Sequence, residues 1–261
     1  IQKTEGRTIM STLALILAGG RGSRLDLLSE KRVKPAVPFA GKFRIIDFTI
    51  SNCTNSGIFD IAILTQYLPL SLNEHIGVGR PWDLDRRDSS ITLLQPHKEW
   101  YAGTADAVLQ NIGYIKRKNP KHVIILSGDH IYKMDYKKMI DDHIKNGSGL
   151  TIAVQPVPWE DAHRFGILTA DDDRKITKFS EKPAKPDSNL ASMGIYVFDT
   201  DVLLNAITTV QDPNLDFGKH IIPYLLENST LYAYVFEDYW KDVGTYDSYL
   251  EASIELTRTV D

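Results

Sequence analysis

Short, unbroken apolar runs recur along this chain, and they constrain its fold more than any other feature. Runs of this length suit strands of a sheet that is covered on both faces. The predicted strands are Thr12–Ala18, Asp60–Gln66, His122–Ser127, Leu150–Val157, Met193–Phe198 and Leu231–Phe236. The segment KITKFS, residues 175–180, is predicted as a further strand.

Helical patterns separate these runs. In Thr104–Lys118 apolar residues recur at spacings of three and four, and Thr104 is the expected N-cap. Tyr136–Asn146 should end at Asn146-Gly147, since glycine adopts the left-handed conformation that ends helices. Two more helices are predicted, Phe217–Asn228 and Tyr246–Thr257. Strands that alternate with helices predict a three-layer α/β fold with a mostly parallel sheet. Such sheets bind ligands at the carboxyl ends of their strands, where the strand order reverses.

Composition narrows the class of protein. The 261 residues include 43% hydrophobic and 25% charged residues, which is ordinary for a soluble globular protein of one large or two small domains. A net charge of -4 argues against a nucleic-acid binder, and no apolar run is long enough to span a membrane. We expect residues 1–11 to be a leader or expression remnant and residues 12–261 to form the functional domain.

Cys53 is the only cysteine, so an intramolecular disulfide is excluded. This usage favours a reducing, cytoplasmic setting. No nearby histidine suggests a catalytic pair, and we expect Cys53 to be a small buried apolar residue.

A glycine-rich loop, Gly19-Gly20-Arg21-Gly22-Ser23-Arg24-Leu25, follows the first predicted strand. Glycines there let the backbone approach a phosphate and turn its N–H groups toward it. The loop lacks the Gly-Lys-Ser/Thr of a P-loop and the third glycine of a dinucleotide fingerprint. Taken alone, it is as compatible with a structural turn as with a phosphate site.

The residues after this loop favour the phosphate site. Between Arg21 and Arg44 there are seven basic and only two acidic residues, in a chain that is acidic overall. Such a local surplus indicates a polyanionic ligand, although a solvated basic face is the alternative. We expect Pro35 to hold Lys34 in an extended conformation. Arg24 and Lys34 are therefore the leading phosphate-binding candidates.

The motifs LAGGRGSRL and KRVKPAVPFAGKFRIIDFTISNCTNSGI closely resemble the opening of the bacterial glucose-1-phosphate adenylyltransferases, a branch of the sugar nucleotidyltransferase family. The similarity continues in order through GTADAVLQN, SGDHIYKMDY, FSEKP, LASMGIYVFD, DFGKHIIP and YWKDVGT. The resemblance implies a Rossmann-like, glycosyltransferase-A-like domain. It also implies that ATP and glucose 1-phosphate form ADP-glucose and diphosphate, the committed step of glycogen or starch synthesis.

The same resemblance assigns Asp129 and Asp242 as the ligands of a catalytic Mg²⁺ and makes Arg24 and Lys34 catalytic. Asp129 should project from the carboxyl end of its strand into the ligand crevice. Oxygen ligands that leave room for water and phosphate suit magnesium, and neither spacing fits zinc. The resemblance, and not spacing, links Asp129 to Asp242. A sugar 1-phosphate is largely dianionic at neutral pH, so no general base is expected.

The resemblance also implies substrate contacts. The expected nucleotide contacts are Leu17, Gly19, Gly20, Gly22, Gln66, Gln95, Gly103 and Thr104. The expected sugar-phosphate contacts are Tyr101, Gly166, Glu181, Lys182 and Ser192. From the residues alone, an exposed ion pair is the better interpretation of Glu181 and Lys182, and the resemblance reverses it. The choice of adenine rests wholly on the resemblance.

Lys31, Arg32 and Arg44 match basic positions that bind anionic effectors in this family. Pro38 departs from the polar residue of several relatives, and the segment between Lys182 and Leu190 is shorter than in many. Full-length relatives add a left-handed β-helix that helps to build tetramers. No hexapeptide repeat is visible here, so we expect this chain to lack it.

Two alternatives stay open from the sequence. The enzyme could use UTP, dTTP or GTP in place of ATP, or the chain could be a non-catalytic regulatory subunit of the same fold. A regulatory subunit would be expected to lose loop cations or metal carboxylates. Arg24, Lys34, Asp129, Lys182 and Asp242 are all present, which favours an active enzyme.

Overall fold

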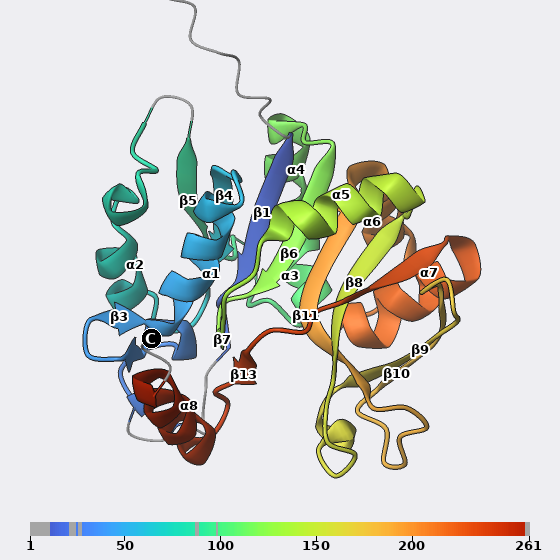
Figure 1. Cartoon of the computed structure of the whole chain (residues 1–261). Coiled ribbons are helices and arrows are strands. Elements are labelled where there is room, and N and C mark those ends of the chain that lie inside the picture. The colour runs from blue at the N-terminus through green and yellow to red at the C-terminus, as the bar shows by residue number, and fades with distance from the viewer. Residues whose placement is uncertain (1–10, 21–24, 26–27, 87–88, 98, 259–261) are drawn as a thin grey trace, which may run out of the picture.

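The computed structural model describes residues 11–20, 25, 28–86, 89–97 and 99–258 (Figure 1). The strands are β1 (Thr12–Leu17), β2 (Pro38–Phe39), β3 (Phe43–Arg44), β4 (Asp60–Leu64), β5 (Ser90–Leu94), β6 (His122–Ser127), β7 (His130–Tyr132), β8 (Leu150–Pro156), β9 (Gly166–Ala170), β10 (Ile176–Glu181), β11 (Leu190–Asp199), β12 (Leu231–Val235) and β13 (Trp240–Asp242). The helices are α1 (Ile45–Asn55), α2 (Leu70–Ile76), α3 (Thr104–Gln110), α4 (Ile112–Lys118), α5 (Tyr136–Asn146), α6 (Thr200–Thr209), α7 (Ile222–Asn228) and α8 (Tyr246–Arg258). Short 3-10 turns cover η2 (Lys34–Ala36), η3 (Arg80–Trp82) and η4 (Ala162–Arg164).

The central sheet is mixed. Its strands lie in the order β10-β9-β11-β6-β1-β4-β5, and β8 joins β11 to β12. β6, β1, β4 and β5 are mutually parallel, whereas β11 runs antiparallel to both β6 and β8. The predicted Rossmann-like α/β sheet with mostly parallel central strands is therefore confirmed, with β11 as the reversed strand between its two halves.

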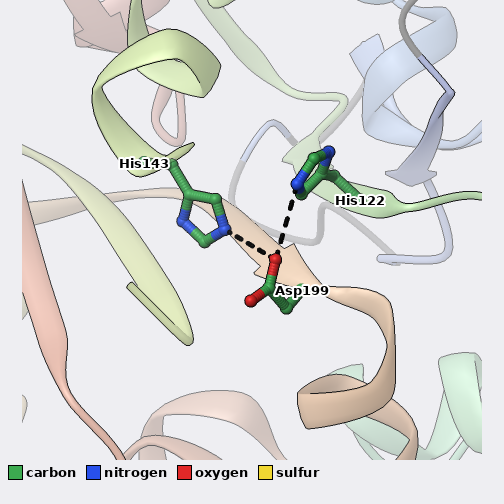
Figure 2. Close-up of side chains that lie close together, drawn as sticks. All are labelled: His122, His143 and Asp199. Carbon is green, nitrogen blue, oxygen red and sulfur yellow. Dashed lines mark hydrogen bonds and ion pairs between the residues drawn. The ribbon is translucent and has the colours of Figure 1, made fainter. Parts of the chain in front are cut away.

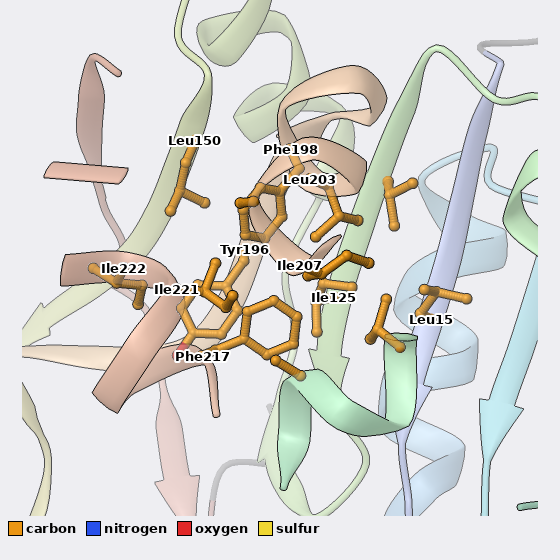
Figure 3. Close-up of a cluster of buried hydrophobic side chains, with 14 of the residues drawn as sticks. Leu15, Ile125, Leu150, Tyr196, Phe198, Leu203, Ile207, Phe217, Ile221 and Ile222 are labelled. Atoms are coloured by element: carbon orange, nitrogen blue, oxygen red, sulfur yellow. The ribbon is translucent and has the colours of Figure 1, made fainter. Parts of the chain in front are cut away.

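Side chains alternate between the two faces of β1. Leu13 and Leu15 belong to a cluster that α3, α4, α6 and α7 cover (Figure 3). Ala14 and Ile16 belong to a second cluster, which α1, α2 and α5 cover. Burying one such aliphatic side chain contributes about 1.5–3 kcal/mol, so both helical layers are held to the sheet by apolar contact. This is the predicted three-layer arrangement.

A smaller cluster under α8 completes the end of the molecule that carries the site. Phe39 of the β2–β3 hairpin meets the ring of Tyr249 edge-on, with centroids 5.5 Å apart. The Tyr249 hydroxyl donates to the Pro38 carbonyl at 2.7 Å. α8 is thereby fixed beside the turn that carries Lys34, although more than 200 residues separate them along the chain.

Three helix predictions need correction. Asn111 interrupts the segment Thr104–Lys118, and its side-chain amide donates to the Ala107 carbonyl and to the Tyr101 hydroxyl. Gly103 and not Thr104 is the N-cap of α3, and the Thr104 hydroxyl donates to Asp216 at 2.8 Å. The segment Phe217–Asn228 opens with a π-helical turn over Phe217–Ile221 before α7.

Other predicted elements agree closely with the structure. α5 ends at Asn146, and Gly147 follows in the left-handed region with φ 58°.

The described helices include none that is both long and apolar enough to cross a lipid bilayer. Of the predicted leader, residues 1–10 lie outside the described part of the chain. Ser11 is anchored, because its carbonyl accepts from the N–H of Lys121 at 2.8 Å.

Candidate active site

A cleft of about 540 Å³ lies at the carboxyl ends of three parallel strands. Leu17 ends β1, Leu64 ends β4 and Ser127 ends β6, and all three line it. β4 and β6 flank β1 on opposite sides, so the strand order reverses at this point. This is the location that the alternating pattern predicts for a ligand site.

The start of the glycine-rich loop forms one wall of the cleft. Gly19 and Gly20 line it, whereas Gly22 and Arg24 lie outside the described residues. Gln66 braces this wall, because its amide nitrogen donates to the Gly19 carbonyl at 3.5 Å and its oxygen accepts from the Tyr101 N–H at 2.7 Å. Both polar atoms of the Gln66 side chain, which the sequence predicted to contact the base, therefore already bond to backbone groups.

Lys34 forms part of the floor of the cleft. It is the first residue of the 3-10 turn η2 and not part of an extended segment, which corrects the sequence expectation. The Ala36 N–H donates to Val33 at 2.9 Å and the Val37 N–H donates to Lys34 at 3.0 Å, and a proline is tolerated in the first turn of a helix. The side chain of Lys34 is only 7% exposed.

The ammonium of Lys34 joins the two predicted metal carboxylates. It donates to Asp129 at 2.7 Å and to Asp242 at 2.9 Å. Asp129 follows β6 by two residues, and Asp242 ends β13. The structure therefore brings together three predicted site residues that are remote in sequence.

A two-stranded ladder explains why Asp129 and Asp242 meet. β13 runs antiparallel to β7, and its register pairs Asp242 with His130, the residue after Asp129. The Trp240 indole N–H donates to His130 Nδ1 at 3.3 Å, which assigns the ring proton to Nε2. That nitrogen lies 3.6 Å from Asp129 and 3.8 Å from Asp242.

Charge balance in this cluster favours ionised carboxylates. Burial alone would raise the pKa of Asp129, but the Lys34 ammonium and His130 lower it below its usual range, with a hydrogen bond from the Ser127 hydroxyl. Burial opposes ionisation of Asp242 in the same way, yet His130 and Lys34 lower its pKa as well. Burial tends to lower the pKa of Lys34, and the two carboxylates outweigh this and raise it. All three groups are charged at neutral pH.

The carboxylates suit a hard divalent cation. Ligand atoms of Asp129, His130 and Asp242 all lie within 4.8 Å of one another. Asp129 lines the cleft, and carboxylate oxygens beside such a space match the preference of magnesium for a few protein oxygens together with water and phosphate. Lys34 already supplies one positive charge between them, so these carboxylates are arranged to hold a cation.

The start of α3 forms another part of the cleft lining. Gly103 is required by close approach, because a Cβ there would lie 2.3 Å from the Leu215 carbonyl oxygen. Thr104 lines the cleft beside Asp216, to which its hydroxyl donates. Tyr101 also lines it, although its hydroxyl already accepts from Asn111 at 3.0 Å.

Glu181 lies next to this part of the lining. An added Cβ at Gly218 would lie 2.5 Å from the Glu181 carboxylate and 3.5 Å from Asp216, so the two carboxylates flank one glycine. Gly166 pairs with Glu181 across β9 and β10. Lys182 follows in a left-handed conformation, φ 48°, and its side chain is 65% exposed.

Ser192 lies at a bulge in β11. Its hydroxyl accepts from the Gly194 N–H at 3.2 Å, and Gly194 has φ 68°. A Cβ at Gly194 would approach Ser127 at 3.9 Å, so this bulge lies beside the end of β6. Of the predicted sugar-phosphate residues, Tyr101 lines the cleft, whereas Gly166, Glu181, Lys182 and Ser192 do not.

Four predicted residues lie apart from the cleft. Gln95, just after β5, is exposed and does not line it. Of the predicted effector residues, Lys31 is exposed and Arg32 is half-buried. The Arg44 guanidinium donates to the Ala36 carbonyl at 3.1 Å and to the Ser71 hydroxyl at 2.6 Å, which ties the Lys34 turn to α2.

The sequence predictions missed three residues of the site, namely Ser127, His130 and Asp216. Ser127 and His130 are neighbours of Asp129 in SGDHIYKMDY, and Asp216 opens DFGKHIIP. These motifs supported the family resemblance, but local pattern gives no sign that β7 pairs with β13 or that Asp216 faces Thr104.

Comparisons with known proteins agree with this geometry. Residues 13–259 match the family model described as nucleotidyl transferase. The chain is 55% identical to a glucose-1-phosphate adenylyltransferase of Lachnospira eligens over 94% of its length, and 54% identical to one of Geobacillus stearothermophilus over 94%. It spans 59% and 65% of the length of those relatives.

A solved structure gives the same result for the fold. A putative glucose-1-phosphate thymidylyltransferase from Bacillus anthracis, crystallised in complex with sucrose, superposes with a TM-score of 0.81 at 25% identity. The superposition covers 96% of each chain. With the cleft at the strand ends, the paired carboxylates and a family match over nearly its whole length, the chain belongs to the nucleotidyltransferase family.

Proposed function

We propose that this chain catalyses the transfer of an adenylyl group from ATP to glucose 1-phosphate, with release of diphosphate. The observation that carries the chemistry is the Lys34 ammonium, held by Asp129 and Asp242 in the floor of a cleft with glycine amides on its wall. The relatives named above support the choice of substrates.

The proposed reaction needs positioning more than proton transfer. The phosphate of glucose 1-phosphate is largely dianionic at pH 7, so it attacks the α-phosphorus of ATP without a base. The bond to the α-phosphate forms as the bond to diphosphate breaks, and charge accumulates on the phosphate oxygens. In-line placement and cationic groups then supply most of the catalysis. Asp129 acts as a ligand and not as a base.

Mg²⁺ is the proposed metal, with Asp129 and Asp242 as its protein ligands. When bound, it supplies positive charge that neutralises the phosphates of the nucleotide. The bound metal would neutralise the negative charge of both carboxylates without Lys34, and we expect the Lys34 ammonium to turn toward the phosphates. Arg24, outside the described residues, is proposed to meet the same phosphates.

The sugar phosphate is proposed to bind beside Glu181 and Lys182. Glu181 accepts hydrogen bonds from sugar hydroxyls, and the exposed ammonium of Lys182 meets the phosphate. The Ser192 hydroxyl accepts from the N–H of Gly194, which lies beside Ser127 at the end of β6, and this supports a place for Ser192 in the same subsite. The base is proposed to lie between the Gly19 wall and the start of α3.

Homotetramers of the full-length protein and binding of an anionic metabolite at Lys31 and Arg32 are expected from the family resemblance alone. Arg44 already bonds backbone of two neighbouring elements, which supports a positioning role for it. A cytoplasmic location fits the single cysteine.

A diphosphate-release assay tests the proposed function. Glucose 1-phosphate and Mg²⁺ are supplied with ATP, UTP, dTTP or GTP in separate reactions. The expected result is a clear preference for ATP, and Asp242→Asn serves as the inactive control. A preference for UTP would contradict ADP-glucose synthesis but leave nucleotidyl transfer intact. No diphosphate from any pair would favour the regulatory-subunit alternative.

A further inference from the structure

A second cluster of metal-ligating side chains lies at the other end of the central strands from the cleft. His122 begins β6, Asp199 ends β11 and His143 projects from α5 (Figure 2). The antiparallel register of β11 and β6 places Asp199 directly opposite His122. Five residue steps along β6 separate His122 from Ser127, which is roughly 17 Å in a strand. These residues therefore cannot serve the phosphates in the cleft.

The three side chains converge on one point. Nε2 of His122 and Nε2 of His143 each lie 3.4 Å from the same oxygen of Asp199, Oδ1. The three ligand atoms all lie within 4.8 Å of one another. Figure 2 shows both rings with a nitrogen directed at this carboxylate.

The distances fit a tetrahedral ion better than direct hydrogen bonds. Strong N–H···O bonds have donor–acceptor distances near 2.9 Å, which is well below 3.4 Å. Ligands at about 2.0–2.1 Å from a tetrahedral zinc ion are separated from one another by about 3.3–3.4 Å. Both N···O distances in the cluster have this value and the two nitrogens lie within 4.8 Å of each other, so an ion fits once the side chains adjust.

A hydrogen bond on the other ring nitrogen fixes the orientation of His143. Its Nδ1 lies 2.9 Å from the hydroxyl of Thr151, which is fully buried, and the His143 ring itself is 1% exposed. A proton on Nδ1 directed to that hydroxyl leaves the lone pair of Nε2 facing Asp199. Metal-binding histidines are usually held by such a bond on the other ring nitrogen.

The surroundings also provide access. The side chain of Asp199 is 48% exposed and that of His122 is 16% exposed, so the cluster is accessible to an ion and to water from solvent. Burial lowers the pKa of both imidazoles, against the opposing effect of Asp199, which leaves them neutral at neutral pH. Neutral imidazole is the form that binds metals.

We propose that His122, His143 and Asp199 form a binding site for a divalent transition metal of the zinc class, separate from the catalytic cleft. Two imidazoles and one carboxylate select zinc, cobalt or nickel over magnesium, which prefers oxygen ligands. The ion joins the start of β6, the end of β11 and α5, so its binding stabilises the fold.

Metal titration tests this site. Metal-free protein is titrated with Zn²⁺ by calorimetry in excess Mg²⁺, and with Co²⁺ while the visible spectrum is recorded. Zinc is expected to bind one ion per chain at the site and to raise the unfolding temperature, and cobalt should give the intense visible bands of a tetrahedral complex. The variants His122→Gln and Asp199→Asn should weaken zinc binding at least tenfold. Each is compared with His163→Gln, which removes an exposed histidine elsewhere.

A further variant separates this site from the catalytic one. His130→Gln removes the only imidazole of the catalytic cluster in the described residues, and it should keep the zinc affinity and the cobalt spectrum. The proposal is overturned if His122→Gln and Asp199→Asn bind zinc as tightly as the unaltered chain. It is also overturned if His130→Gln abolishes the binding, or if zinc does not bind. None of these outcomes bears on ADP-glucose synthesis.

Discussion

The ammonium of Lys34 lies 2.7 Å from the carboxylate of Asp129, although 95 residues separate them in the sequence. The same ammonium lies 2.9 Å from Asp242, so one lysine holds the two carboxylates that are proposed to bind Mg²⁺. Lys34 and the metal therefore compete for the same oxygens when no nucleotide is bound. This competition makes the site testable without substrates.

Replacing Lys34 with Met should increase the stabilisation that Mg²⁺ gives. The variant leaves Asp129 and Asp242 without their cation, and breaking a buried ion pair typically costs about 3–5 kcal/mol. Unfolding temperatures in chelator should fall, and Mg²⁺ should raise them more in the variant than in the unaltered chain. Equal shifts with Mg²⁺ would show that the lysine and the metal do not share these ligands. Turnover should fall about 100-fold or more, because a phosphate contact is lost.

Replacing Lys182 with Ala should affect glucose 1-phosphate more than ATP. A hydrogen bond to a charged group is worth about 1.5–3 kcal/mol, which corresponds to a rise in KM of roughly 10–100-fold. The KM for ATP should change little. Lys185→Ala, an exposed lysine on the same loop, is the matched control and should leave both constants unchanged. Equal increases in both KM values for Lys182→Ala would refute its place in the sugar subsite.

Two glycine substitutions should have opposite effects on stability. A Cβ at Gly103 would lie 2.3 Å from the Leu215 carbonyl, so Gly103→Ala must displace the wall of the cleft and should weaken both folding and ATP binding. Gly113 lies exposed in α4 with nothing within 4 Å of an added Cβ. Gly113→Ala should stabilise the chain by up to about 1 kcal/mol. Denaturant unfolding measures both, and a stable Gly103→Ala with normal ATP affinity would contradict the assigned contact.

Cys53 should be unreactive in the folded protein. It is fully buried on α1, and burial raises the pKa of its thiol well above the usual range, so little thiolate exists at neutral pH. A thiol reagent should label no cysteine in the native protein and one per chain in denaturant. Rapid labelling of native protein would show that α1 opens readily or that the residue lies at an exposed site.

The sequence predicted the long apolar strands, but it did not predict strands such as β5 and β9 or the helices α1, α2 and α6. Apolar runs such as His122–Ser127 coincide with strands because the sheet is covered on both faces. α1 was not predicted, since it buries polar residues such as Asp47 and Asn52 and so shows no clear apolar stripe. The Asn52 amide donates to the Tyr132 carbonyl and accepts from the Met134 N–H, and local pattern cannot reveal these tertiary bonds.

The residues of the site also fall into two groups, those whose role the sequence indicated and those whose role it did not. Lys34 and Asp129 stand at predicted strand ends or beside a basic run, so residue types and order indicate their role. The link to Asp242 depends on the pairing of β13 with β7, across about 110 residues, and only the family resemblance supplied it. The bracing role of Gln66 also lay beyond sequence reasoning, because it depends on the distance between two loops.

Locating the bound metal tests the central claim most directly. Crystals with Mn²⁺ in place of Mg²⁺, ATP and a non-reacting analogue of glucose 1-phosphate would show its position by anomalous scattering. The account predicts one peak that both Asp129 and Asp242 contact, with the Lys34 ammonium moved from the carboxylates to the phosphates. A triphosphate bound elsewhere, or a peak away from both carboxylates while Lys34 still bridges them, would contradict it.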